Sequence, residues 1–262
     1  MAVFVWENAA EVCMIKFFDV SKKYCQRVWA LADVDLEVPE GANFLLRGDS
    51  GSGKTTLLKM IYALEQPDKG YVMVAGRNIF KLRESSIPYL RRHIGFIFQD
   101  LRLMENRTLM ENVGYPLQLR GVWGQKAKKR VEKACELVNL ERRLSCRCRD
   151  LSMGERQLSA LARALVGEPA LLLADEPTAH LDSNGTNHVL NLLTRINNSG
   201  TTVILATGDK GVADGFQASH VCRLENGRLR SFLREESEES GTAELCGESV
   251  SGEVERGVSL KG

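Results

Sequence analysis

The sequence lacks any apolar run that could cross a membrane. Its longest run, Pro169 to Ala174, is far shorter than the ~20 residues that a spanning helix needs, and it predicts a buried strand instead. The N-terminal stretch also lacks the basic leader of a signal peptide and carries Glu7 and Glu11. We therefore expect any role at a membrane to depend on a partner that is itself inserted.

The sequence also lacks an excess of either charge. Lys and Arg number 35, Asp and Glu number 34, and the formal net charge is +1. A protein held mainly by nucleic-acid phosphates usually has a basic excess or a basic stripe, so no nucleic-acid partner is expected. Proline is sparse at six residues, whereas 44% of the chain is hydrophobic, which is enough for one large core.

Paired cysteine motifs are missing, although the chain has seven cysteines. Only Cys146 and Cys148 are close in sequence, and their spacing is not that of a zinc ribbon. Scattered cysteines of this kind are typical of reduced thiols in a cytosolic protein.

What the chain does have is an alternation of strand-like and helical segments. Extended segments are predicted at 14–20, 30–38, 43–47, 93–100, 170–177 and 201–209, with a closing hairpin at 220–229. Helical spacing is predicted at 55–64, at 122–140 and in a stretch from Arg156. Nearly all-apolar strands are typical of a parallel sheet covered on both faces. The order of the segments predicts an α/β layered core.

A phosphate-binding loop lies between the third strand and the first helix. The residues GDSGSGKT at 48–55 fit the pattern G-x-x-x-x-G-K-[ST]. In this loop backbone N–H groups surround the phosphates, and the next helix directs its positive end toward them. Lys54 is expected to reach the β- and γ-phosphates, and Thr55 to bind Mg²⁺. The nucleotide-binding residues predicted here are Gly48, Asp49, Ser50, Gly51, Ser52, Gly53, Lys54, Thr55 and Thr56.

Two carboxylates end the apolar strand at 170–177. We expect Asp175 to hold Mg²⁺, mostly through water, and Glu176 to polarise the attacking water as general base. An apolar strand that ends in Asp-Glu is common by itself. The phosphate-binding loop in the same chain is what favours a catalytic role.

Further motifs resemble those of the ATP-binding cassette (ABC) family. Ser152, Gly154 and Glu155, in the run LSMGE, resemble the family's LSGGQ-type signature. Gln99 resembles the Q-loop residue, and Asp182 resembles the D-loop aspartate. Tyr24, Gln99 and Asp182 thus join the candidate site, Tyr24 because its position resembles that of the aromatic residue that stacks on adenine.

The resemblance implies the fold, cofactors and assembly of that family. The fold is an α/β P-loop NTPase, with a RecA-like core, an antiparallel β subdomain and a helical subdomain. ATP and Mg²⁺ are the implied cofactors, with Thr55, Gln99 and Asp175 at the metal and with Glu176 and Gln99 as catalytic residues. Two copies are expected to face head to tail, so that Ser152 and Gly154 of one contact a γ-phosphate held by Lys54 of the other.

The resemblance also sets the expected domain limits. It covers Met14 to about Arg230, which predicts an ATPase domain at 14–233 with a helical subdomain at about 101–157. Residues 1–13 are expected to be a non-native or flexible extension. The segment 234–262, with eight acidic and three basic residues, is expected to be a disordered acidic tail.

Within the family the chain more closely resembles the cell-division ATP-binding proteins called FtsE. The stretch YLRRHIGFIFQDLRLMENRTLMENV at 89–113 is more specific than the general cassette motifs. It implies a homodimer that works with an integral membrane subunit resembling FtsX, at the cytoplasmic face of the inner membrane. The segment after Gln99, including Met104 and the helical insertion, would form the groove for that subunit. The ATPase would then couple ATP-driven dimerisation to cell division and to control of cell-wall hydrolases.

Three positions depart from the family pattern: Gly208, Met153 and Arg156, which replaces a usual glutamine next to Glu155. Gly208 stands where the family normally has a histidine that contacts the γ-phosphate and the attacking water. Loss of such a donor commonly lowers a rate by ~10²–10³, so slow hydrolysis with nearly intact nucleotide binding is predicted. Met153 replaces the first signature glycine and is expected to be tolerated. His180 and His220 are expected to lie on the surface rather than to replace the missing histidine.

Alternative functions remain open at this stage. The LLADEPT motif followed by Leu181-Asp182 is shared with the ATPases of lipoprotein-release and macrolide-type exporters, so only the segment 89–103 separates the two interpretations. A non-hydrolysing scaffold gated by ATP is a further alternative, which Gly208 favours and which intact Lys54, Asp175 and Glu176 oppose.

Overall fold

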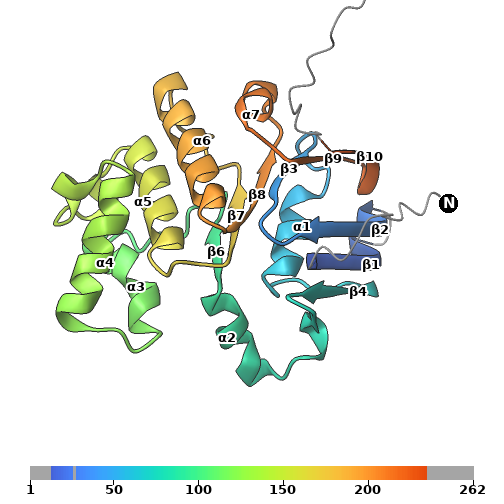
Figure 1. Ribbon diagram of the computed structural model, residues 1–262, viewed down its shortest axis with the longest axis horizontal. Coiled ribbons are helices and arrows are strands. Elements are labelled where there is room, and N and C mark those ends of the chain that lie inside the picture. The colour runs from blue at the N-terminus through green and yellow to red at the C-terminus, as the bar shows by residue number, and fades with distance from the viewer. Residues whose placement is uncertain (1–12, 26–27, 235–262) are drawn as a thin grey trace, which may run out of the picture.

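The computed structural model describes residues 13–25 and 28–234 (Figure 1). The extension predicted at 1–13 and the acidic tail predicted at 234–262 lie outside the described residues, except for Cys13 and Arg234 at their borders. No helix in the described ranges has the length and apolar character that crossing a bilayer requires.

A six-stranded sheet forms the centre of the molecule. Its spatial order is β10-β9-β3-β8-β7-β6, and all neighbours are parallel except β10, which pairs antiparallel with β9. The strands are β3 (Asn43–Arg47), β6 (Ile94–Ile97), β7 (Leu171–Asp175), β8 (Thr202–Thr207), β9 (His220–Glu225) and β10 (Arg228–Arg234).

A four-stranded antiparallel sheet lies beside the central sheet. Its order is β2-β1-β4-β5, and its strands are β1 (Cys13–Cys25), β2 (Val28–Pro39), β4 (Lys69–Val74) and β5 (Arg77–Asn78). Figure 1 shows it on the opposite side of the molecule from the helical part formed by α3, α4 and α5.

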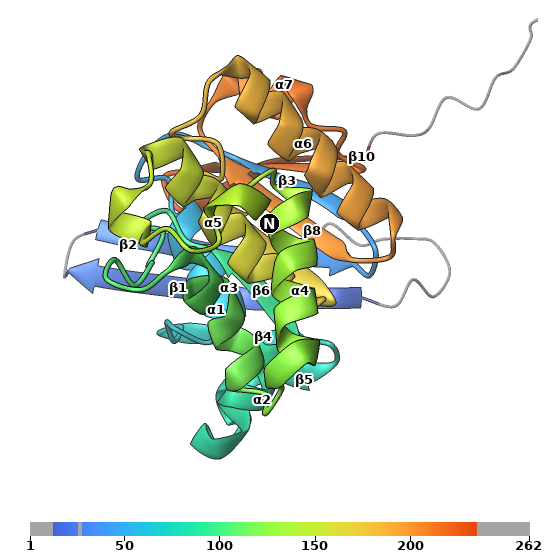
Figure 2. The same cartoon turned by 90° about the vertical axis from the view of Figure 1, so that its left-hand side faces the viewer.

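Seven α-helices complete the described part of the chain. They are α1 (Lys54–Ile61), α2 (Ile87–Arg92), α3 (Leu109–Gln118), α4 (Gly124–Leu137), α5 (Met153–Leu165), α6 (Ser183–Asn198) and α7 (Lys210–Gly215). Figure 2 shows α3, α4, α5 and α6 in front of the central sheet, with α2 at the foot of the molecule.

Alternate residues of the central strands belong to two different hydrophobic cores. Leu172 and Leu205 pack with the apolar faces of α3 to α7. Leu171, Leu173 and Ile204 point to the other face, where they pack with α1 and the antiparallel sheet. All five residues of β7 are buried, because a parallel strand between two layers exposes neither face. The predicted α/β layered core is confirmed.

The helix predicted from Arg156 begins earlier, at Met153. The hydroxyl of Ser152 accepts a hydrogen bond from the Glu155 N–H at 3.2 Å, and the Glu155 carboxylate accepts one from the Ser152 N–H at 2.8 Å. This capping box starts the helix inside the signature motif. The signature residues are therefore the first turn of α5.

The predicted insertion contains α3 and α4. Of the four residues predicted on one face, Val131 and Ala134 are buried on α4, Val138 is buried just after its end, and Leu137 is half-buried. Lys126, Lys128 and Lys129 lie on the exposed side of α4. β4, β5, α2, α6 and α7 were not predicted as separate elements. β4 and β5 belong to a sheet whose pairing is set by strands far along the chain.

Candidate nucleotide site

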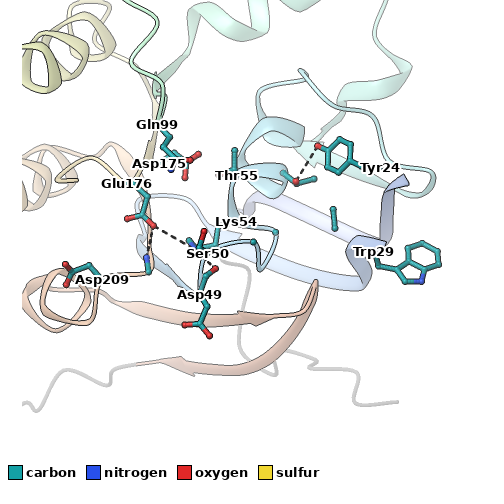
Figure 3. A pocket seen from close by; sticks show the side chains of 15 residues that line it. Tyr24, Trp29, Asp49, Ser50, Lys54, Thr55, Gln99, Asp175, Glu176 and Asp209 are labelled. Atoms are coloured by element: carbon teal, nitrogen blue, oxygen red, sulfur yellow. Dashed lines mark hydrogen bonds and ion pairs between the residues drawn. The ribbon is translucent and has the colours of Figure 1, made fainter. Parts of the chain in front are cut away.

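The carboxyl ends of β3, β7 and β8 meet at one edge of the central sheet, next to the start of α1. Ligands of open α/β sheets bind at this edge. A cavity of about 720 Å³ lies there (Figure 3). Its lining residues are Tyr24, Trp29, Ala30, Asp49, Ser50, Gly51, Gly53, Lys54, Thr55, Thr56, Gln99, Asp175, Glu176, Gly208 and Asp209.

The predicted phosphate-binding loop forms one wall. Gly53 has φ +110°, and a Cβ atom there would overlap the carbonyl oxygen of Ala30, so only glycine fits. The loop leads into α1, whose first residue is Lys54. Of the residues predicted at 48–56, Gly48 and Ser52 do not line the cavity. The other seven do.

Lys54 is held inside the loop. Its ammonium group donates to the carbonyl oxygens of Gly48 at 2.6 Å and Asp49 at 3.0 Å. It also lies 3.8 Å from Oε1 of Glu176. The side chain is only 7% exposed, and these oxygens supply the partners that a buried ammonium group needs. A phosphate oxygen at the loop could take the place of these acceptors.

Asp175 and Thr55 form a polar pair at the base of the cavity. Burial raises the pKa of Asp175, the nearby charge of Glu176 raises it further, and a hydrogen bond from Thr55 opposes the shift. The Oδ1 atom of Asp175 is buried without a hydrogen-bond partner among the described residues. An orphaned carboxylate oxygen beside a hydroxyl matches the hard oxygen ligands that Mg²⁺ prefers. Gln99 lines the same cavity, and Figure 3 shows it next to Asp175.

Glu176 is fixed by its neighbours on the β8 side. Its Oε2 accepts from the Thr207 hydroxyl at 2.9 Å, and its Oε1 accepts from the Gly208 N–H at 2.7 Å. The backbone of Glu176 has φ +48°, a conformation that non-glycine residues adopt rarely and often at functional sites. The carboxylate therefore faces Lys54 in one defined orientation.

The aromatic side chains lie at the far end of the cavity. Tyr24 is 54% exposed, and its hydroxyl is 3.4 Å from the Thr56 hydroxyl. Trp29 lies at the outer rim, with its ring directed away from Lys54 (Figure 3), and the Lys23 ammonium lies 3.8 Å from the centre of its indole. Tyr24 is thus available to stack on a planar base.

The structure does not bring the signature and D-loop residues to this cavity. Ser152, Gly154 and Glu155 begin α5, and Asp182 caps α6 by accepting from the Gly185 N–H at 2.7 Å. None of them is a lining residue. Ser152 and Asp182 are exposed, so both are open to contact with another molecule.

Position 208 lies beside Lys54 and Glu176. A Cβ atom on Gly208 would lie 3.6 Å from Oε1 of Glu176, 3.7 Å from Nζ of Lys54 and 3.1 Å from the Gly48 carbonyl oxygen. A histidine side chain would start beside Lys54 and Glu176. Glycine leaves only its backbone N–H there, and Glu176 already binds that group.

Four lining or supporting residues were missed from the sequence: Trp29, Ala30, Thr207 and Asp209. Thr207 and Asp209 flank Gly208, and the Thr207 hydroxyl accepts from the Asp209 N–H at 3.0 Å while it donates to Glu176. Their position at the end of the predicted strand 201–209 was the available signal. Trp29 gave no motif signal, because its place at the rim depends on the pairing of β1 with β2.

The prediction that His220 lies on the surface is wrong. His220 is 5% exposed, because it begins β9 against β3 in the middle of the sheet. Its Nδ1 lies 2.8 Å from the Ser219 hydroxyl. His180 is exposed, as predicted.

Known proteins are similar to this chain in sequence. Residues 31–179 match a family model described as ABC transporter. The chain is 38% identical to the cell division ATP-binding protein FtsE of Streptococcus pneumoniae over 224 residues, which cover 86% of this chain and 96% of that protein. It is 41% identical to the FtsE protein of Escherichia coli over 196 residues, which cover 75% and 88% of the two chains.

A solved structure agrees in fold. The ATP-binding cassette MJ0796, solved as a dimer in a post-hydrolysis state bound to ADP and Pi, superposes with a TM-score of 0.80. It is 33% identical and covers 86% of this chain and 100% of its own. The predicted α/β P-loop NTPase fold is thereby confirmed. This chain is a member of the ATP-binding cassette (ABC) transporter family.

Proposed function

We propose that this chain is the ATP-binding and ATP-hydrolysing subunit of an FtsEX-like complex. The observation that carries the proposal is the meeting of Lys54, Asp175 and Glu176 at one cavity, with the Lys54 ammonium 3.8 Å from the Glu176 carboxylate. A phosphate-binding lysine and a carboxylate beside it are what hydrolysis of a terminal phosphate requires. The similarity to FtsE proteins supports the cell-division role.

The loop wall binds the triphosphate. Backbone N–H groups of residues 49–56 and the start of α1 attract the phosphate oxygens, and Lys54 moves its hydrogen bonds from the loop carbonyls to the β- and γ-phosphates. The Tyr24 ring stacks on the adenine base at the open end of the cavity.

Thr55, Gln99 and Asp175 would hold Mg²⁺. Bound there, the ion neutralises charge on the phosphate oxygens. The chain's own contribution is the carboxylate of Asp175, which burial keeps free of other hydrogen bonds on Oδ1.

Glu176 acts as general base. Its carboxylate accepts a proton from the water that attacks the γ-phosphorus, and the bond between that phosphorus and the bridging oxygen breaks to give ADP and phosphate. Thr207 and the Gly208 N–H hold the carboxylate in place. With no histidine at 208, this centre offers one donor fewer to the transition state, which predicts slow hydrolysis.

A second copy completes the site. Ser152, Gly154, Glu155 and Asp182 lie outside the cavity of their own chain, and the related cassette MJ0796 has been solved as a dimer. In a head-to-tail homodimer the signature turn of one copy covers the γ-phosphate in the other. An integral membrane subunit resembling FtsX would then receive the movement at the cytoplasmic face of the inner membrane.

A non-hydrolysing, ATP-gated scaffold is the second candidate. Gly208 favours it, because the residue gives the γ-phosphate no side chain and its N–H is already bound to Glu176. Both candidates need ATP binding and dimerisation, and only hydrolysis separates them.

The test is steady-state ATPase activity of the full chain and of Glu176→Gln, with ATP binding measured on both. We expect the hydrolysis rate of the variant to be ~10²–10⁴-fold lower, which is the usual contribution of a general base. Its affinity for ATP should not change. Tight ATP binding without hydrolysis in the unmodified chain would establish the scaffold. Absence of ATP binding would refute both functions.

A further inference from the structure

The signature turn at the start of α5 carries a negative charge. Glu155 stands where an LSGGQ-type signature has a neutral glutamine, and Oε2 of its carboxylate accepts from the Ser152 N–H at 2.8 Å. The hydrogen bond from the Ser152 backbone lowers the pKa of Glu155, and the charge of Arg143 lowers it further, so the carboxylate is ionised at neutral pH. The homodimer proposed above would place this turn next to a γ-phosphate, which is also negative.

Arg143 neutralises that carboxylate. Its Nε donates to Oε1 of Glu155 at 2.8 Å, a short distance that is typical of a hydrogen bond between charged groups. Arg143 ends the short turn Glu141–Arg143, which follows α4, and α4 lies beside α5 (Figure 1). Among the described residues no other cation lies within 4.0 Å of the Glu155 carboxylate. Arg156, the neighbour of Glu155, pairs with Glu105 instead.

The backbone just before the signature is held by a different arginine. Nε of Arg156 donates to the carbonyl oxygen of Leu151 at 3.1 Å, and its Nη2 donates to that of Arg149 at 2.6 Å. Ser152 remains exposed. Arg156 therefore fixes the path of the chain into the signature, whereas only Arg143 balances the charge of Glu155.

A second capping box in the same chain has the same charges but lies outside the signature. At the start of α3, Oε2 of Glu111 accepts from the Thr108 N–H at 2.8 Å, and its Oε1 accepts from Nη1 of Arg107 at 2.8 Å. The side chains of Arg107 and Glu111 are 63% and 42% exposed, compared with 53% and 23% for Arg143 and Glu155. The two ion pairs are thus alike in geometry and differ in what a second copy would cover.

Both ion pairs should contribute little to the stability of the single chain, because water screens partly exposed charges. A second copy that covers the signature changes this for Glu155 alone. A carboxylate without its cation would then be dehydrated beside a phosphate, and like charges repel more strongly where water is excluded.

We propose that Arg143 is a positioning residue of the shared nucleotide site, which orients Glu155 and cancels its charge so that the signature turn can accept the γ-phosphate held by a second copy. The proposal rests on the proposed function for the head-to-tail homodimer. It adds the residue that makes an acidic signature compatible with a phosphate. Arg143 acts through Glu155 and not by touching the nucleotide.

The test compares Arg143→Gln with Arg107→Gln, each introduced into the full-length Glu176→Gln chain. Light scattering during titration with ATP and Mg²⁺ gives the ATP concentration at which half of the chain is dimeric. We expect Arg143→Gln to raise this concentration by ~10-fold or more, about the value of one hydrogen bond to a charged group, and Arg107→Gln to leave it unchanged. Melting temperatures, and ATP binding to the dilute single chain, should not change in either variant.

A rescue variant separates balance of charge from mere structural support. Glu155→Gln added to Arg143→Gln keeps a side chain that can cap the helix and removes the unbalanced carboxylate. We expect it to recover most of the lost dimerisation. A double variant as weak as Arg143→Gln would show that Arg143 supports the fold of this region only, and the proposal would be wrong.

The same titrations distinguish the proposal from the proposed function. If the Glu176→Gln parent binds ATP and stays monomeric, the shared site itself fails, and the role of Arg143 fails with it. If the parent dimerises and Arg143→Gln dimerises equally well, the proposed function stands and the role of Arg143 alone is refuted.

Discussion

The residues around Glu176 decide how fast this site can work. Both carboxylate oxygens are hydrogen-bonded from the segment 207–208, so the base is well oriented. The missing element is a side-chain donor near the γ-phosphate at position 208.

Gly208→His should therefore raise the hydrolysis rate. The Cβ atom would contact the Gly48 carbonyl oxygen at 3.1 Å, which a small shift can relieve, and the imidazole would extend toward the phosphate. We expect kcat to increase by ~10–100-fold, below the full effect of an oriented donor, with the Kd for ATP unchanged. Steady-state kinetics and nucleotide titration measure both. A variant no faster than the unmodified chain would contradict the interpretation that Gly208 slows hydrolysis.

Thr207 donates a hydrogen bond to Glu176 but is not among the residues that line the cavity. Thr207→Val keeps the shape and removes the donor to Glu176, so we expect kcat to fall by ~10-fold, about the value of one hydrogen bond to a charged group. The KM for ATP should not change, and Thr207→Ser should restore the rate. If Val and Ser lose activity equally, the hydroxyl has no positioning role.

At the scale of elements, two helices begin with a capping box, so the effects of removing each box can be compared. Thr108 and Glu111 cap α3, and Ser152 and Glu155 cap α5. Each box satisfies backbone N–H groups that the first helical turn leaves free. Only the second box belongs to the signature.

Ser152→Ala and Thr108→Ala should therefore differ in function but not in stability. Each should lower the free energy of unfolding by about 1 kcal/mol, the usual loss at an N-cap, as chemical denaturation can measure. Only Ser152→Ala should weaken ATP-dependent dimerisation, because its hydroxyl is the one expected at the partner's γ-phosphate. Equal effects of the two variants on dimerisation would mean that the signature acts only through helix stability.

At the scale of the whole molecule, the signature residues do not line the nucleotide cavity of their own chain, and we propose that a second copy supplies them. Glu176→Gln in the presence of ATP and Mg²⁺ should therefore form a stable homodimer, since the bound nucleotide links the two copies and is not hydrolysed. Light scattering after size-exclusion chromatography should give twice the monomer mass. ADP should leave the chain monomeric. A monomer in ATP would argue against the shared site.

Local patterns were enough to predict much of the site. The loop 48–55, the Asp175-Glu176 pair and the apolar strands are contiguous runs, and their chemistry depends on residues close in sequence. The packing of β7 between two layers also followed from its composition, because an all-apolar strand must be covered on both faces.

Other features depended on contacts between distant segments. The burial of His220 comes from the pairing of β9 with β3, about 175 residues apart in sequence. The start of α5 at Met153, in contrast, comes from a local capping box. Trp29 lies opposite Lys23 in the pairing of β1 with β2, and no motif in the sequence marks it.

The sequence by itself determined the candidate chemistry of this protein: a phosphate-binding loop pattern, an aspartate that we propose as a metal ligand, a glutamate that we propose as general base, and a glycine where the family usually has a histidine. Only the tertiary structure decided how these groups meet, and that Arg143 pairs with the carboxylate of Glu155 in the signature turn. The physical reason is the distance along the sequence between the residues that interact. Local sequence fixes helices, strands and loops, whereas charge balance around a site depends on side chains that only the packed chain brings together.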